Sequence, residues 1–428
     1  MKPESLTTCA RQNQQQLRAA PGIGAVVLTV AVILIAANLR APMTSVSPLL
    51  DEIIHKLGMS HPAAGAITTL PLMAFAAFSL LSSRLSGRYG MERVLLAALI
   101  LLACGLLLRP WRGSGLLLAG TALAGMGIAV CNVLLPALIN RYFPQRLGVM
   151  TGMYTVSMNL IGSLASAMSV PIARTWGLGW EKTLALWGVV ALITALYWLF
   201  YMRTWPSPVP QAAAGDRAGG RMSLWRFRLS WQMTLHLGLQ SFFFYIVMAW
   251  LPHIAAERGI GAETAGWMVS LMQFGGLPFN FFVPLIAVRM KDQRALVMVS
   301  AVMTVAGIAC LFTDRGALLA LGGALVGSAA AAAFSLSMMF FNLRTADARQ
   351  AAEMSGMAQS VGYLLACTGP VLFGWLHDLT GGWNAPLYVL TGFVLVFIWA
   401  GLGAGRNTRL PGSEKEERNN LRTENSNI

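Results

Sequence analysis

Apolar stretches of membrane-spanning length recur along the whole chain, and short charged or polar stretches separate them. A helix that crosses a bilayer needs about 20 mostly apolar residues. Its backbone groups have to bond within the segment, because the hydrocarbon core offers them no water. The pattern therefore predicts an all-α membrane protein. Its apolar windows predict twelve transmembrane helices, near residues 22–50, 62–83, 94–109, 115–140, 148–173, 182–202, 230–254, 264–288, 295–313, 316–342, 353–377 and 384–404.

Composition narrows the class further. Hydrophobic residues make up 56% of the 428 residues and charged residues only 11%, whereas soluble domains carry about 25% charged residues. The net charge is +14, but the basic residues lie singly in loops and not in the stripe typical of a nucleic-acid interface. The five cysteines have no Cys-x-x-Cys spacing, so a disulfide framework or metal site is not expected. We expect no cofactor and no nucleic-acid partner.

One connection is much longer than the others and divides the chain into two halves. It holds three prolines, several glycines and several arginines. The last stretch is polar and of mixed charge, which is typical of a disordered tail. The predicted organisation is a cytoplasmic N-terminal tail (1–21), an N-terminal six-helix bundle (22–202), a central cytoplasmic linker (203–229), a C-terminal six-helix bundle (230–405) and a cytoplasmic C-terminal tail (406–428).

The distribution of lysine and arginine predicts the orientation. If both termini are cytoplasmic, 23 of the 31 basic residues lie in inner segments and seven in outer loops. The remaining one is Arg40, inside the first helix. Basic residues concentrate in cytoplasmic loops of membrane proteins. We therefore expect a multi-pass protein of a bacterial-type cytoplasmic membrane with both termini inside.

The two halves resemble each other at a nearly constant offset of 201 residues, which drifts to 204 further along. A duplication of six helices gives two parallel, pseudo-symmetric bundles about an axis along the membrane normal. The matched pairs include Gly58 with Gly259, Arg88 with Arg289, Arg93 with Arg294, Gly115 with Gly316 and Gly152 with Gly356.

The segment 83–95 resembles the loop between helices 2 and 3 of the major facilitator superfamily. Arg88, Gly90 and Arg93 fit that pattern, and Gly87 stands where the family usually has aspartate. The second copy, residues 284–296, keeps two arginines. The resemblance implies that these loops hold the outward-open state through helix-end contacts, although they also serve as orientation signals. The candidate gating residues are Arg84, Arg88, Arg93, Arg289 and Arg294.

A closer resemblance is to the cyanate and 2-nitroimidazole transporter branch of that superfamily. The motif Asn38-Leu39-Arg40-Ala41-Pro42 resembles its first helix, and the run from Ser355 to Leu365 is most similar to its 2-nitroimidazole-transporting members. This resemblance implies a secondary active or facilitative transporter of a small anionic or polar heteroaromatic solute, working by alternating access. The alternatives are a cyanate or other small-anion transporter, or a drug exporter of the same superfamily.

Polar side chains well inside the apolar segments are the candidate substrate ligands, because the site in this architecture lies near the bilayer midplane between the halves. Arg40 is the clearest charge at membrane depth, where an arginine costs about 2.5–3.5 kcal/mol to insert. The full set is Asn38, Arg40, Asn132, Tyr154, Asn159, His236, Gln240, Tyr245, Gln273, Asn280, Gln359 and Tyr363. Tyr154, Phe243, Phe244, Tyr245 and Tyr363 are candidates to stack on a flat ring. The alternative for each amide or tyrosine is an interhelical hydrogen bond, worth about 0.6 kcal/mol.

The acidic residues bear on the coupling mechanism. All 17 lie in loops, tails or helix ends, whereas proton-coupled transporters commonly use a membrane-buried carboxylate. The alternatives are coupling protons that pass through His236 and no proton coupling at all. A facilitator, an anion exchanger and the movement of a substrate that itself carries protons all remain open. An enzyme is not expected, because a nucleophile with its base, or a metal site, has no counterpart at membrane depth. The expected partners are a small-molecule substrate and the lipid bilayer, and the expected state is a monomer.

Overall fold

The computed structural model describes residues 22–59, 61–111, 113–204 and 223–411, and the regular structure in these residues is helical. The tails 1–21 and 412–428 and most of the linker (205–222) lie outside the described residues. Eleven helical spans in the described part are long and apolar enough to cross a membrane. The twelfth crossing is α14 (Ala348–Thr380), whose 33 residues include a polar first turn. At 1.5 Å per residue it is about 50 Å long.

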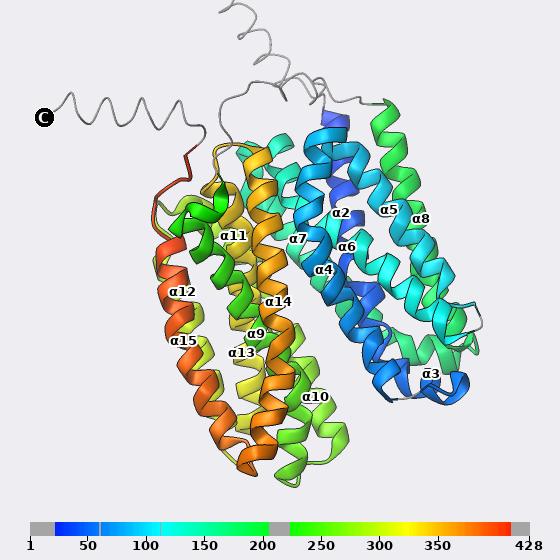
Figure 1. Ribbon diagram of the computed structural model, residues 1–428, viewed down its shortest axis with the longest axis vertical. Helices are drawn as coiled ribbons and strands as arrows, with labels where there is room; N and C mark the ends of the chain where they lie inside the picture. Colours follow the sequence, from blue (N-terminus) through cyan, green and yellow to red (C-terminus); the bar gives the residue numbers. More distant parts are fainter. Residues whose placement is uncertain (1–21, 60, 112, 205–222, 412–428) are drawn as a thin grey trace, which may run out of the picture.

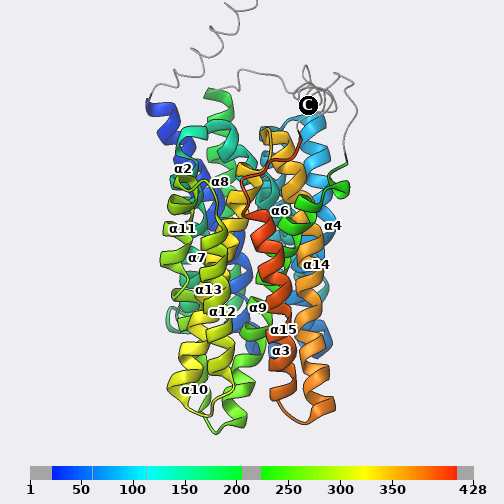
Figure 2. The ribbon, with the colours of Figure 1, turned by 90° about the vertical axis from the view of Figure 1, so that its left-hand side faces the viewer.

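The helices form two groups that lie side by side in Figure 1 and one in front of the other in Figure 2. The N-terminal group comprises α2 (Gly22–Thr44), α4 (His61–Tyr89), α5 (Met91–Leu108), α6 (Ser114–Tyr142), α7 (Leu147–Val170) and α8 (Gly179–Thr204). The C-terminal group comprises α9 (Arg228–Glu257), α10 (Ala262–Phe274), α11 (Leu277–Arg289), α12 (Arg294–Leu311), α13 (Gly316–Leu343), α14 and α15 (Asn384–Ala404).

Two crossings differ in detail from the sequence prediction. The first helix ends at Thr44, and the short helix α3 (Leu50–Leu57) follows it. The predicted segment 264–288 is two helices, because Gly275 and Gly276 interrupt it and Pro278 removes a backbone donor from the start of α11. A Cβ atom on Gly276 would lie 2.7 Å from Cβ of Ala331 on α13. The break therefore lets this crossing pack tightly against the centre of its own half.

The internal duplication is visible in how the helices pack. In the first half, a Cβ on Gly105 of α5 would lie 2.7 Å from the carbonyl oxygen of Gly120 on α6. In the second half, a Cβ on Gly307 of α12 would lie 3.0 Å from the carbonyl oxygen of Gly322 on α13. Small residues at a crossing let two membrane helices approach closely. The same crossing is therefore built twice, about 202 residues apart.

The matched positions at the start of α5 and α12 make equivalent polar contacts with different side chains. In the first half, Glu92 accepts hydrogen bonds at one end of the bundle from Tyr142 (2.7 Å) and lies 3.3 Å from Arg141. In the second half, Gln293 holds the equivalent position and accepts a hydrogen bond from Arg344. The Gln293 amide also donates to carbonyl oxygens of α11 and the loop after it, at 3.0 and 2.7 Å. A carboxylate would lack these donors, which explains why glutamine suits the second copy.

Arg344 completes this second cluster. It caps α15 by donating to the carbonyl oxygens of Ala404 (3.0 Å) and Gly405 (3.1 Å). Burial lowers the pKa of Arg344 below its usual value. Carbonyl groups at a helix C-terminus carry partial negative charge, so these contacts offset the loss of water around the guanidinium.

The two halves pack closely against each other at one end of the cavity described below. There α7 packs on α11 and α4 packs on α14. A Cβ on Gly148 would lie 2.8 Å from the carbonyl oxygen of Pro284, and one on Gly356 would lie 2.7 Å from that of Ser79. Glycine at these places allows backbone-to-backbone contact between the halves. We call this end the closed end.

Hydrogen bonds join the halves between these glycine contacts and the cavity. Thr155 of α7 donates to the carbonyl oxygen of Asn280 at 2.7 Å. Gln359 of α14 donates to the carbonyl oxygen of Asn132 on α6 at 3.1 Å. Ser360 also donates to a carbonyl of α4. The closed end is therefore sealed by a polar layer and a glycine layer, and in Figure 1 the two groups diverge from it toward α3 and α10.

Candidate functional site

A cavity of about 450 Å³ lies between the two halves. It begins at the polar layer of the closed end, since Asn132 and Asn280 line it. It reaches the level of Val46, which follows α2, and of Arg109, the residue that ends α5. Both halves contribute helices to its wall. This position, near the middle of the helices and between pseudo-symmetric bundles, is where the sequence predicts a substrate site.

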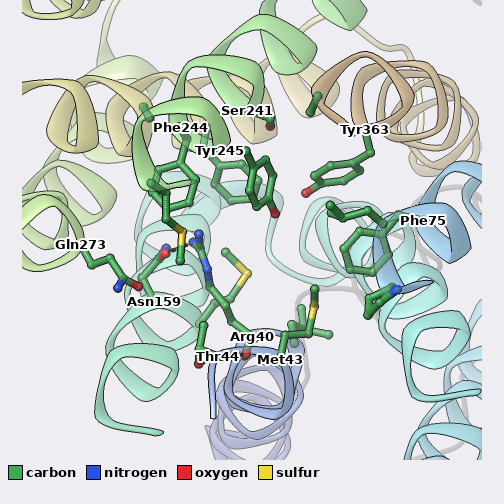
Figure 3. A pocket seen from close by; sticks show the side chains of 18 of the residues that line it. Arg40, Met43, Thr44, Phe75, Asn159, Ser241, Phe244, Tyr245, Gln273 and Tyr363 are labelled. Carbon is green, nitrogen blue, oxygen red and sulfur yellow. Dashed lines mark hydrogen bonds between the residues drawn. The ribbon is translucent and has the colours of Figure 1, made fainter. Parts of the chain in front are cut away.

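Arg40 of α2 is the central charge of this cavity. Its guanidinium donates to the side-chain oxygen of Asn159 on α7 and lies 5.0 Å from the ring centroid of Phe244 on α9. Asn159 in turn donates to the carbonyl oxygen of Thr155 at 2.8 Å, which fixes its orientation. Figure 3 shows Arg40, Asn159 and Phe244 together on one side of the cavity. Arg40 is half-buried, so the cavity can reach its remaining donors.

Close packing of α2 on α7 positions Arg40. A Cβ on Gly162 would lie 3.1 Å from both Cβ and Cγ of Arg40, so the missing side chain leaves room for the arginine stem. One turn later, Thr44 donates to the carbonyl oxygen of Gly162 at 2.6 Å. Gly162 thus leaves room for Arg40, and its carbonyl oxygen holds the end of α2 through Thr44.

Aromatic and thioether side chains make the cavity walls. Phe75 and Tyr363 lie with ring centroids 5.0 Å apart across the two halves, and Phe244 and Tyr245 meet edge to face at 5.5 Å. Met43, Met158, Met248 and Met272 also line the wall. Aromatic faces and flexible methionines suit a flat, apolar ring body.

The structure brings eight of the predicted ligands together at the cavity. Gln240 donates to Ser241 at 2.6 Å, and Asn280 accepts from Ser335 at 3.0 Å. Gln273 lies beyond Asn159 in Figure 3. The eight lining residues are Arg40, Asn132, Asn159, Gln240, Tyr245, Gln273, Asn280 and Tyr363.

Four predicted ligands lie outside the lining, and each makes a contact within the protein. Asn38 is fully buried and donates to Thr194 of α8 at 2.9 Å, behind Arg40. Tyr154 is fully buried and donates to the Asn132 side chain at 3.2 Å. Gln359 belongs to the polar layer of the closed end. For these residues the structure shows hydrogen bonds between helices, which is the alternative to substrate binding that the sequence allows.

His236 is the fourth of these residues, and it faces the interior of the C-terminal half. Its Nδ1 lies 2.9 Å from the hydroxyl of Ser337 on α13, and its ring stacks on Phe397 of α15 at 4.8 Å. The side chain is fully buried. His236 and Gln240 are four residues apart on α9, yet only Gln240 lines the cavity.

Arg109 is a lining residue that sequence reasoning missed. It is 1% exposed and donates to the carbonyl oxygen of Pro42 at 2.7 Å. Its Nε finds no acceptor among the described residues. The predicted orientation puts Arg109 at an outer helix end, where few basic residues are expected, and this is the sequence signal that points to it. Thr44, Phe75, Ser163 and the four methionines are further lining residues outside the predicted set.

The five candidate gating arginines lie at the closed end and are exposed. Arg294 pairs with Asp292 at 3.2 Å, and Arg88 lies 5.3 Å from the ring of Tyr89. The partners that hold this end shut in the described residues are instead glycine contacts and amide or hydroxyl groups.

The polar groups of the described lining are positively charged or neutral. Among the described lining residues, the charged ones are Arg40 and Arg109, and the other polar ones are amides, hydroxyls and a thiol. A planar guanidinium offers two parallel donors to a carboxylate-like or nitro-like group. A bundle of membrane-crossing helices with such a cavity between its halves defines a transporter for small molecules.

The comparisons place this transporter in a family. The chain matches the model of the Major Facilitator Superfamily over residues 28–313 and 233–425. It is 42% identical to the uncharacterised transporter YycB of Bacillus subtilis (strain 168), over 91% of this chain and 96% of that protein. It is 38% identical to the 2-nitroimidazole transporter of Escherichia coli (strain K12), over 91% and 98%. The cyanate transport protein CynX of the same organism is 26% identical, over 82% and 90%.

The chain belongs to the major facilitator superfamily, in the branch that contains the 2-nitroimidazole and cyanate transporters. A solved structure of the proton:xylose symporter XylE superposes with a TM-score of 0.71, over 92% of this chain and 98% of that one, at 14% sequence identity. That likeness shows the shared fold. The predicted fold class and family resemblance are therefore confirmed.

Proposed function

We propose that this transporter carries small, flat anionic or polar heteroaromatic solutes, with 2-nitroimidazole as the first compound to test. The main support for this proposal is Arg40. This half-buried arginine reaches the cavity, and its hydrogen-bond acceptor is the neutral amide oxygen of Asn159. The solute's oxygen atoms would accept from the guanidinium, and its ring would lie against Phe244 and the neighbouring tyrosine.

The relatives support this substrate class. Proteins named as transporters of 2-nitroimidazole and of cyanate are 38% and 26% identical to this chain over most of its length. Both compounds are small and flat and present electronegative atoms. A cavity of about 450 Å³ also lies within the range typical of small-molecule sites. A cyanate-like anion or an exported drug is the alternative, and Arg40 favours the anion.

During alternating access, the two halves would separate from each other at the closed end. We take that end as cytoplasmic, because the basic loops lie there, so the described state faces outward. Rocking of the halves would part the glycine contacts of α7 with α11 and of α4 with α14, while the opposite ends approach. Both termini would lie in the cytoplasm of a bacterial-type inner membrane, and a monomer would suffice because the whole cavity lies within one chain.

A thermal-shift screen of the purified protein tests the substrate class. We expect 2-nitroimidazole, cyanate or benzoate, a flat carboxylate, to raise the Tm, because a ligand that binds the folded state stabilises it. Hydrogen bonds to charged groups contribute about 1.5–3 kcal/mol, and each 1.4 kcal/mol is tenfold in affinity. Arg40→Gln should therefore weaken the active compound's binding at least about tenfold.

Arg226→Gln is the matched control, since Arg226 is an exposed arginine in the short helix Leu224–Arg226, away from the cavity. We expect it to bind as the parent does. Equal ligand stabilisation of the parent and a folded Arg40→Gln variant would show that the solute binds elsewhere.

A further inference from the structure

The charges around Arg40 are unbalanced within the cavity wall. Its acceptor, Asn159, is a neutral amide, and its other close neighbour is the face of Phe244. The second charged group of the described lining, Arg109, has the same sign. Ion pairs found in the described residues lie at helix ends, such as Arg141 with Glu92 and Arg174 with Glu52. The described part of the wall therefore supplies no full negative charge to Arg40.

An unbalanced charge affects one step of transport more than the others. While the cavity is open, water surrounds the free donors of Arg40. When the halves rock, the cavity has to shed much of that water, and a charge in a low-dielectric space is strongly disfavoured unless it is paired. A bound anion pairs it, whereas the empty cavity does not. The loaded protein should thus close readily, and the empty protein should remain open.

We propose that this carrier is an anion exchanger: a substrate anion moves inward or outward only in return for an anion carried the other way. Arg40 is the residue that imposes this exchange, and the neutrality of Asn159 is what makes it obligatory. This inference rests on the proposed function for its cargo, but its central step, the immobility of the empty protein, is measurable without any substrate.

Position 159 offers a direct test, because it is the hydrogen-bond partner of Arg40. Asn159→Asp replaces an amide oxygen by a carboxylate of nearly the same shape, so Arg40 gains a built-in counter-charge. The empty protein should then change state freely, and the carboxylate should compete with substrate anions. Asn159→Leu removes the same hydrogen bond without adding charge, and it is the matched control.

Cys367 reports the state of the cavity. It lines the wall on α14 and is partly exposed. With the other four cysteines replaced by alanine, its labelling by a cationic, membrane-impermeant methanethiosulfonate can be timed in right-side-out and inside-out vesicles in a gluconate buffer. A cationic reagent cannot itself act as the counter-anion of Arg40. The carboxylate of the Asn159→Asp variant attracts the reagent from both sides, so the ratio of the two labelling rates cancels this attraction.

Without substrate, we expect outer-side labelling of the parent to be at least about tenfold faster than inner-side labelling. Asn159→Asp should bring the two rates within about threefold of each other. Asn159→Leu adds no counter-charge, so its outer-side labelling should stay at least about tenfold faster than its inner-side labelling. Equal rates from both sides in the parent, or the same change in both variants, would overturn the inference.

Flux separates this inference from the proposed function. Proteoliposomes loaded with labelled 2-nitroimidazole, cyanate or benzoate are diluted into gluconate buffer with or without the same unlabelled compound. We expect efflux at least about tenfold faster with the unlabelled compound outside. Equal efflux in both buffers would reject exchange and leave transport standing. If none of the three compounds moves, the proposed substrate class fails, and the Cys367 labelling alone decides whether the empty protein is locked.

Discussion

At the scale of single residues, the cavity is organised around one arginine and the group that orients it. Arg40 is placed by Gly162, which leaves room for its stem, and is held by Asn159. Asn159 is held by Thr155, whose hydroxyl donates across to the other half at Asn280. The cavity and the closed end therefore meet at Thr155, which accepts from Asn159 through its backbone carbonyl and donates to Asn280 through its hydroxyl.

His236 gives a residue-scale prediction about coupling. Its ring lies between Ser337 and Phe397, away from the cavity, so we expect it to serve as a packing residue and not as a proton carrier for the substrate. His236→Asn should cost roughly 1–3 kcal/mol of stability through lost packing, seen as a lower Tm. The pH profile of transport in proteoliposomes should keep the parent's shape. A profile that loses its pH dependence in a folded variant would restore His236 as the coupling group.

At the scale of helices, glycine positions set where the halves can meet. Gly356 and Gly148 allow α14 and α7 to approach α4 and α11 at backbone distance. Small residues give membrane helices such contacts, and here they form the seal of the closed end. We expect the seal to open and close, because few hydrogen bonds accompany the glycine contacts.

Gly356→Val tests this seal. The new Cβ would lie 2.7 Å from the carbonyl oxygen of Ser79, so the closed end should open and the outward-facing state should become less populated. We expect labelling of Cys367 from the outer side to slow by at least about threefold. Gly392→Val is the control, since a Cβ at Gly392 of α15 meets nothing within 4 Å. Unchanged labelling in a folded Gly356→Val protein would contradict the role given to this contact.

Most of the helices could be predicted from the sequence, and the errors at single residues have physical reasons. Apolar runs, basic loops and the 201-residue offset are averages over many residues, so they survive local variation. The direction in which one side chain points depends on helix rotation and on the neighbouring helix. Asn38 and Arg40 are two residues apart, so they face different sides of α2, and Asn38 turns to α8. Arg109 was missed because it ends its apolar segment and so resembles a loop residue.

At the scale of the whole molecule, the described state is a cavity closed at one end and bounded by two copies of one bundle. The copies share their glycine crossings and their charged loops, but their polar contributions to the cavity differ. Both halves supply amides and aromatic rings, and among the described lining residues the charged ones, Arg40 and Arg109, belong to the first half. Duplication therefore explains the scaffold, and divergence between the copies explains why the positive charge lies on one side of the cavity.

The most direct measurement is a structure of the protein with 2-nitroimidazole or benzoate bound. The account predicts density for the compound in the central cavity, with its oxygen atoms within hydrogen-bonding distance of Arg40 and its ring against Phe244. A compound bound with Arg40 still directed only at Asn159, or bound outside this cavity, would contradict the central claim.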